Sequence, residues 1–173
     1  MNPLDIIAKY YPVGSEAYRI LVIHSRSVAD KALAIARMHP EMNLDLTFVE
    51  EAAMLHDIGI FRCNAPDIDC HGDAEYICHG YLGAELMRAR VCERHTGTGI
   101  TLAMIEERGL PLPHRDFMPE TLEEQLICYA DKFYSKTKLD KEKSVEKVKQ
   151  GLSKYGNETV ERFDNWCKLF LGE

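Results

Sequence analysis

The 173-residue sequence lacks any apolar run near the ~18–20 residues that a helix needs to cross a bilayer. Its first residues, MNPLDIIAKYYP, also lack the charged start, apolar stretch and small-residue cleavage site of a signal peptide. The six cysteines form no C-x-x-C pair, so reduced thiols are expected. Together these absences predict a cytoplasmic protein without a membrane partner.

Basic residues are fewer than acidic ones. Lys and Arg number 21 against 28 Asp and Glu, which gives a net charge of −7. Because nucleic-acid-binding proteins gather an excess of basic residues, no nucleic acid polymer is expected as a partner. A small phosphorylated substrate is compatible with this balance, since a bound metal can outweigh the global field locally.

The sequence has almost no strand signals, no internal repeat and no long linker. In nearly every segment, residues that would form one helix face instead recur every three or four positions. One such stripe consists of Leu21, His24, Val28, Ala32 and Ile35. The chain length is that of one ordinary domain. We therefore predict an all-α, single-domain helical bundle over residues 1–173.

Apolar spacing, N-caps and helix breakers place the predicted helices. Thr121 and Glu124 fit a capping box at the start of one helix, and Gly59 is the predicted end of another. Residues 62–73 are rich in Asn, Pro, Gly and Asp, which predicts a loop. The predicted helices cover residues 3–12, 15–38, 46–58, 77–90, 101–109, 121–135, 140–155 and a final segment that ends near residue 171.

Several ionisable residues fall where helices are expected to be buried. Burying such groups unpaired is expensive, so they need each other, solvent or a metal. One histidine on an apolar face is usually a hydrogen-bonded core residue, but several from different helices, with carboxylates beside them, suit zinc, iron, manganese, nickel or cobalt. These residues are His24, His56, Asp57, His79, Glu93, His95 and Asp131.

Three cysteines offer an alternative metal site. Cys63, Cys70 and Cys78 lie near His71 and His79 in the sequence, as the ligands of a zinc knuckle do. Their spacings are loose and irregular, which argues against this interpretation.

The order of three motifs resembles a known family. His24, the pair His56–Asp57 within HDIG, and Asp131 within ADK look like the H…HD…D pattern of the HD-domain metal-dependent phosphohydrolase superfamily. The resemblance implies a helical core over about residues 19–135, and we expect the C-terminal helices at residues 140–171 to pack on it.

Two further histidines resemble those of HD proteins with a two-metal centre. His79 lies in CHGYLGAELM and His95 in RHTGTG. The GYP signature of the cyclic-di-GMP phosphodiesterases is missing. The resemblance implies one or two divalent ions of iron, manganese, zinc, nickel or cobalt, the first held by His24, His56, Asp57 and Asp131, and the second by His79, His95 and a bridging Asp57.

The implied activity is hydrolysis of a phosphate ester or anhydride through a metal-activated water, with a small phosphorylated substrate, a nucleotide by expectation. Asp57 would be catalytic, and Lys132 and Arg94 would hold the phosphate, with Arg62 as a third candidate cation. Two alternatives stay open: an HD-like di-iron oxygenase, and a non-catalytic regulatory domain that binds a metal or nucleotide. A homo-oligomer is compatible with the sequence.

Overall fold

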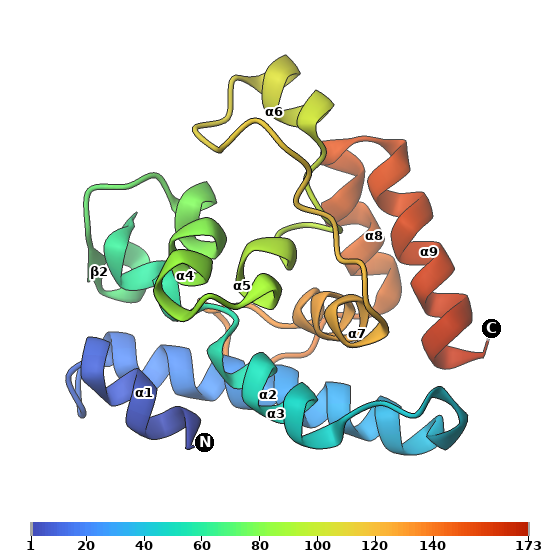
Figure 1. Cartoon of the computed structure of the whole chain (residues 1–173), viewed down its shortest axis with the longest axis horizontal. Helices are drawn as coiled ribbons and strands as arrows, with labels where there is room; N and C mark the ends of the chain where they lie inside the picture. The colour runs from blue at the N-terminus through green and yellow to red at the C-terminus, as the bar shows by residue number, and fades with distance from the viewer. Residues whose placement is uncertain (1, 173) are drawn as a thin grey trace.

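The long helix α2 (Glu16–Met38) runs along one side of the molecule, and α3 (Leu46–Leu55) packs along it (Figure 1). The computed structural model describes residues 2–172. Helix α7 (Leu122–Asp131) lies against both α2 and α3, and α9 (Asn157–Leu171) packs on α7. The other α-helices in the described residues are α1 (Pro3–Tyr10), α4 (His79–Met87), α5 (Arg90–Arg94), α6 (Leu102–Arg108) and α8 (Val145–Leu152).

Short elements connect these helices. The strands β1 (Asn64–Ala65) and β2 (Cys70–His71) form one antiparallel pair inside the segment that was predicted to be a loop. The 3-10 helices are η1 (Pro40–Met42), η2 (Ile58–Arg62), η3 (Pro66–Ile68), η4 (Tyr76–Cys78) and η5 (Ser153–Tyr155). With so little strand, the predicted all-α class is confirmed.

Side-chain caps explain why most helices begin where they do. A side-chain oxygen accepts a backbone N–H at the start of α1, α2, α3, α6, α7 and α8. At α7 the predicted capping box is confirmed, because Thr121 and Glu124 each bond the other's backbone N–H. At α6 the predicted end is confirmed too, with Gly109 in the left-handed region at φ 60°.

Four predicted helices are shorter than expected. The helix predicted for residues 46–58 ends at Leu55, and the one predicted for 121–135 ends at Asp131. The helix predicted for 77–90 is replaced by η4, α4 and the separate short α5. Of residues 140–155, the first five are not helical. In three of these places the changed boundary leaves a metal-ligand candidate at or beside a helix terminus: His56 after α3, His79 at the start of α4 and Asp131 at the end of α7.

Gly59 does not end α3, and its role is close packing. It lies within η2, and a Cβ placed there would stand 2.3 Å from the carbonyl oxygen of His79 and 2.4 Å from the backbone nitrogen of Gly83. Only glycine permits this approach, so η2 and α4 are in direct backbone contact. The contact fixes His79 relative to the His56–Asp57 pair.

The main core joins residues from α1 through α9. Tyr129, Phe163 and Phe170 stack where α7 meets α9, and Val148 and Leu152 bury one face of α8. A smaller cluster around Leu82, Ile105 and Phe117 supports α4 and α6. All six cysteines are buried free thiols, as predicted.

Tyr11 ties the N-terminal segment to η2. Its hydroxyl donates to the carbonyl of Ile58 at 3.0 Å and accepts the N–H of Phe61 at 2.9 Å. Burial raises the pKa of this phenol far above its usual value. The segment that follows the His56–Asp57 pair is therefore held at two backbone points.

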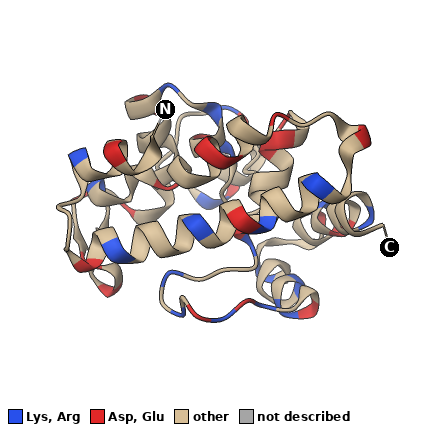
Figure 2. Ribbon diagram, turned by 90° about the horizontal axis from the view of Figure 1, so that it is seen from below, with Lys and Arg blue, Asp and Glu red and all other residues tan. Residues whose placement is uncertain are grey.

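Charged residues of both signs occur along α2 and along the loop between α7 and α8 (Figure 2). Within the described residues, no helix is both long enough and apolar enough to span a bilayer.

Candidate metal centre

The six predicted ligand residues come together at the meeting point of five helices. His24 lies in the middle of α2, His56 and Asp57 directly follow α3, and Asp131 is the last residue of α7. His79 begins α4 and His95 directly follows α5. The histidines and Asp57 are buried, and the side chain of Asp131 is 12% exposed.

One oxygen of Asp57 faces a group from α2, α3 and α7. Its Oδ2 lies 3.2 Å from His24 Nε2 and 3.0 Å from His56 Nε2. The same two nitrogens lie 3.0 Å and 3.5 Å from Asp131 Oδ1. These ligand atoms lie within 4.8 Å of one another, as a single metal ion requires of two imidazoles and two carboxylates.

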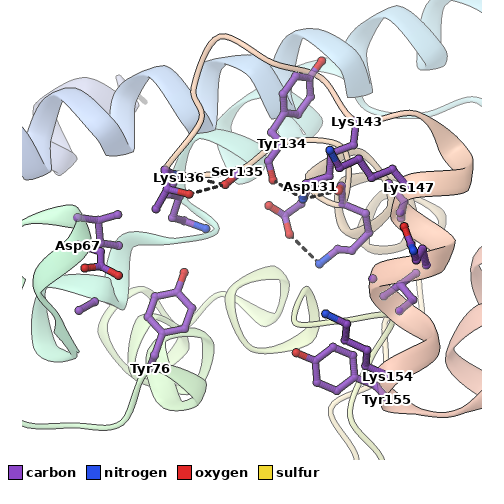
Figure 3. A pocket seen from close by; sticks show the side chains of 18 of the residues that line it. Asp67, Tyr76, Asp131, Tyr134, Ser135, Lys136, Lys143, Lys147, Lys154 and Tyr155 are labelled. Carbon is purple, nitrogen blue, oxygen red and sulfur yellow. Dashed lines mark hydrogen bonds and ion pairs between the residues drawn. The ribbon is translucent and has the colours of Figure 1, made fainter.

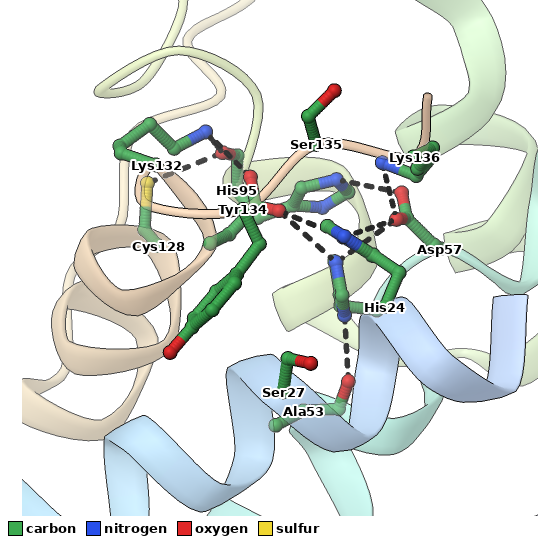
Figure 4. A network of polar contacts seen from close by, with 12 residues as sticks. His24, Ser27, Ala53, Asp57, His95, Cys128, Lys132, Tyr134, Ser135 and Lys136 are labelled. Atoms are coloured by element: carbon green, nitrogen blue, oxygen red, sulfur yellow. Dashed lines mark hydrogen bonds and ion pairs between the residues drawn. The ribbon is translucent and has the colours of Figure 1, made fainter. Parts of the chain in front are cut away.

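The other oxygen of Asp57 faces a second group. Its Oδ1 lies 3.3 Å from Nε2 of both His79 and His95, and these two nitrogens are 3.0 Å apart. One carboxylate is thus shared between two ligand groups, as Figure 4 shows for Asp57 between His24 and His95. Among the described residues, no cysteine belongs to either group, so the alternative zinc knuckle is not formed.

Backbone carbonyls fix the orientation of three imidazoles. Nδ1 of His56, His79 and His95 lies 2.6 Å from the carbonyl oxygen three residues earlier, of Ala53, Tyr76 and Cys92. A carbonyl only accepts, so each Nδ1 carries the proton and donates. Once Nε2 is free of a proton, it presents its lone pair to the centre. This is the arrangement that metal-ligating histidines commonly adopt.

The centre passes a test for metal binding on its own polar atoms. Nε2 of His24 and His56 and both oxygens of Asp57 are buried without a hydrogen bond of acceptable geometry. Buried polar atoms are nearly always satisfied. The His79 and His95 lone pairs also face each other at 3.0 Å, and only a cation or an added proton relieves that repulsion. The donor set therefore fits one or two divalent ions.

The pKa of His56, in the first group, is raised, whereas those of His79 and His95, in the second group, are lowered. Burial alone would lower the pKa of His56, but Asp57 and Asp131 raise it to about 9. Burial lowers the pKa of His79 to about 3 and also lowers that of His95. Against burial, His56 and Lys136 hold the pKa of Asp57 well below its usual range. Both carboxylates are therefore ionised and available as ligands.

Two lysines lie against the carboxylates. Lys132 Nζ, predicted as a phosphate contact, lies 2.7 Å from Asp131 Oδ2 and donates to the carbonyl of His95 at 2.9 Å. Lys136, which the sequence analysis missed, places Nζ 2.6 Å from Asp57 Oδ2 (Figure 4). Burial would lower the pKa of Lys136, but Asp57 raises it, so the side chain is cationic. Its position five residues after Asp131 was the only available signal.

The other predicted cations lie elsewhere. Arg94 pairs with Glu120 at 2.6 Å and donates to the carbonyl of Met118 at 2.9 Å, and its side chain is only 12% exposed. This guanidinium holds the end of α5 in place and has little capacity left for a phosphate. Arg62 is half-exposed and pairs with Glu85 at 3.8 Å. Neither arginine lines the cavity beside the centre.

That cavity has a volume of about 1000 Å³ and reaches the centre at Asp131, Lys132 and Lys136. Tyr76 lines it on the side of α4, where its ring lies 4.7 Å from that of His79 (Figure 3). The volume of the cavity is at the upper end of the ~300–1000 Å³ range of ligand pockets. The centre therefore borders a space that can admit a substrate.

Comparison with known proteins gives one family and several relatives. A family model described as HD domain matches residues 21–136, which include all six ligand candidates. A tRNA (cytidine(56)-2'-O)-methyltransferase of Picrophilus torridus is 30% identical over 149 residues, 82% of this chain and 37% of that enzyme. The enzyme of the same name from Thermoplasma volcanium is 31% identical over 140 residues, 76% of this chain and 35% of that enzyme.

An uncharacterized protein of Methanocaldococcus jannaschii is 36% identical over 128 residues, which are 68% of each chain. The chain spans little more than a third of the length of the two methyltransferases it matches. No solved structure matches the chain.

Proposed function

Because the chain belongs to the HD domain family, we propose that it is a metal-dependent phosphohydrolase. The substrate would be a small phosphate ester or anhydride, with nucleotides as the expected class. One observation carries the proposal: the Asp57 carboxylate is shared between the His24–His56 group and the His79–His95 group beside a substrate-sized cavity. A carboxylate in that position suits two ions held close together.

When bound, divalent ions supply Lewis-acid activation of a water molecule and neutralise charge that builds on the phosphate. The chain supplies the rest. His24, His56, His79 and His95 would hold the ions through Nε2, and Asp57 and Asp131 through their carboxylates. Three carbonyls keep His56, His79 and His95 in the required tautomer, so most of the centre is organised before substrate arrives.

Lys132 and Lys136 would orient the phosphate. Both ammonium groups contact a carboxylate of the centre and both line the cavity. An ammonium is a compact point charge that suits phosphate oxygens. Lys136 therefore takes the second cationic role that the sequence analysis gave to Arg94.

Methyl transfer is not part of the proposal. The chain matches only about a third of each methyltransferase, so the activity in their name cannot be assigned to any residue of this chain. The buried imidazole–carboxylate centre supports metal chemistry instead.

Metal analysis followed by a substrate panel tests the proposal. The protein, purified without added metal, would be assayed by elemental analysis, then loaded with manganese, nickel, cobalt or iron and given a panel of nucleotides. Phosphate release is expected, and Asp57→Ala is expected to abolish both metal binding and turnover. The exposed Lys168, on α9 away from the cavity, offers a matched control as Lys168→Gln.

Two results would contradict hydrolysis. Oxygen-dependent turnover by an iron-loaded protein would favour the oxygenase alternative. A tightly bound metal that supports thermal stability, with no phosphate release from any nucleotide, would favour the regulatory alternative.

A further inference from the structure

The cavity beside the metal centre is lined by several lysines, and the proposed mechanism uses only Lys132 and Lys136. Five lysines face it against two acidic residues, Asp67 and Asp131, in a chain whose net charge is −7. Figure 3 shows Lys154 and Tyr155 on one side of the cavity, with Asp67 and Tyr76 on the other. The lysines are Lys132, Lys136, Lys143, Lys147 and Lys154.

Three of these lysines come from one segment. Lys143, Lys147 and Lys154 lie beyond residue 136, where the match to the family ends. On α8 and η5 the cavity-lining residues include positions 147, 150, 151 and 154, which share one helical face. Val148 and Leu152 anchor the segment in the core, so the lysine-bearing face is held in place.

The opposite face of α8 is built differently. Lys149 pairs with Asp164 of α9 at 2.7 Å and does not line the cavity. Within the described part of the chain, Lys147 and Lys154 have no carboxylate within ion-pair distance. Among the cavity-lining lysines of this segment, Lys147 and Lys154 are therefore left without an ion pair to any of residues 2–172, while Lys149, which faces α9, is paired.

Like charges are crowded at the inner end of this segment. Lys143 Nζ donates to the carbonyls of Lys132 and Tyr134 at 3.1 Å and 3.2 Å. Burial lowers the pKa of Lys143, Asp131 opposes this, and the neighbouring ammonium groups of Lys132, Lys136 and Lys147 lower it further. A bound polyanion would relieve this repulsion.

We infer that the cavity binds a substrate with at least two linked phosphate groups. This inference rests on the proposed function: Lys132 and Lys136 hold the phosphate next to the metal centre, and Lys143, Lys147 and Lys154 hold the phosphates farther along. The five ammonium groups come from two chain segments, residues 132–136 and 143–154, that line one cavity of about 1000 Å³, more than a single phosphate needs. The site thus favours an oligophosphate over a simple monoester.

A small oligophosphate fits this cavity better than a nucleic acid polymer. The lysines line one pocket with walls from several elements, whereas polymer binding calls for a basic stripe along an open surface. The acidic balance of the chain opposes non-specific binding of a polymer.

Calorimetric titration with inorganic phosphates tests the inference. Full-length protein, as purified and after dialysis against a chelator, would be titrated with orthophosphate, pyrophosphate and tripolyphosphate. In both forms we expect tripolyphosphate to bind at least about tenfold more tightly than orthophosphate, since each added charge-assisted contact contributes about a tenfold factor or more. Lys147→Gln/Lys154→Gln should remove most of that preference, while Lys168→Gln should keep it.

Three results would overturn the inference. These are equal affinity for the three phosphates, an unchanged preference in the Lys147→Gln/Lys154→Gln protein, or tighter lysine-dependent binding of bulk tRNA than of tripolyphosphate. Should the double variant fail to fold, as judged by circular dichroism, the two single variants replace it. Because the titration measures binding, a failed hydrolase assay does not contradict the inference. Hydrolysis without a preference for tripolyphosphate would contradict the inference and leave the proposed function standing.

Discussion

At the scale of single residues, Asp57 organises the centre. Its Oδ2 serves the group of His24 and His56 and its Oδ1 serves that of His79 and His95, each at 3.0–3.3 Å. Because each oxygen of this carboxylate belongs to a different group, removing Asp57 leaves both groups incomplete. The four histidines, by contrast, each belong to one group, so they can be removed one side at a time.

That division predicts the effect of His79→Gln. The group of His24, His56, Asp57 and Asp131 stays whole, so metal content should fall by about one ion per chain rather than to zero. Elemental analysis of the loaded protein measures this. His71→Gln, at an exposed position in β2, is the control and should change nothing. Loss of all metal in His79→Gln would show that the two groups do not load separately.

Lys136→Gln separates phosphate binding from metal binding. Removing a positive charge 2.6 Å from Asp57 Oδ2 should leave metal affinity unchanged or higher, because the ammonium competes with any ion at that oxygen. Turnover should nevertheless fall by about 10²-fold, the usual effect of losing one preorganised donor to the reacting group. Equilibrium metal titration and steady-state kinetics test the two halves. A parallel loss of metal and activity would contradict this assignment.

At the scale of elements, local chemistry could be predicted well from the sequence. Caps and breakers are encoded by neighbours in sequence, so the starts of α2 and α7 and the end of α6 were predicted correctly. The pattern of ionisable groups in apolar helices picked out seven residues, because such groups are costly to bury, and the family resemblance selected the six ligand candidates among them.

Contacts between elements could not be predicted in this way. Gly59 was predicted to end a helix, because a glycine needed for close backbone packing looks the same in the sequence as one that ends a helix. Arg94 and Lys136 read alike as cations near ligands, yet one pairs with Glu120 and the other reaches Asp57. Lys136 reaches Asp57 because of the path of the loop after α7, and that path depends on tertiary packing.

Two glycine substitutions test the packing of η2 on α4. Gly59→Ala should destabilise the protein by about 1–3 kcal/mol, because its Cβ would meet backbone atoms of His79 and Gly83. Gly151→Ala is the matched control: it lies in α8 with open space around it, and should stabilise by about 0.5–1 kcal/mol through helix propensity. Urea unfolding measures both. Equal stability of Gly59→Ala and the unchanged protein would contradict the close contact.

At the scale of the whole molecule, the centre joins the ends or middles of five helices, so metal binding and folding should be linked. At free metal about 100-fold above the dissociation constant, binding to the folded state should add about 2.7 kcal/mol. For a chain of this size that corresponds to a rise of roughly 5–10 °C in Tm.

Thermal unfolding in a chelator and in a metal series measures this linkage. The protein with Asp57→Ala should show no dependence of Tm on metal concentration. A metal-independent Tm in the unchanged protein would mean that the ligand groups contribute nothing to folding.

The wall formed by α8 has a consequence for divergence. The metal-ligand candidates all lie between positions 24 and 131, whereas the cavity-lining residues of α8 and η5 follow position 140. Selection can therefore exchange this wall of the cavity, and with it the ligands that the cavity admits, while the metal-ligand candidates stay unchanged.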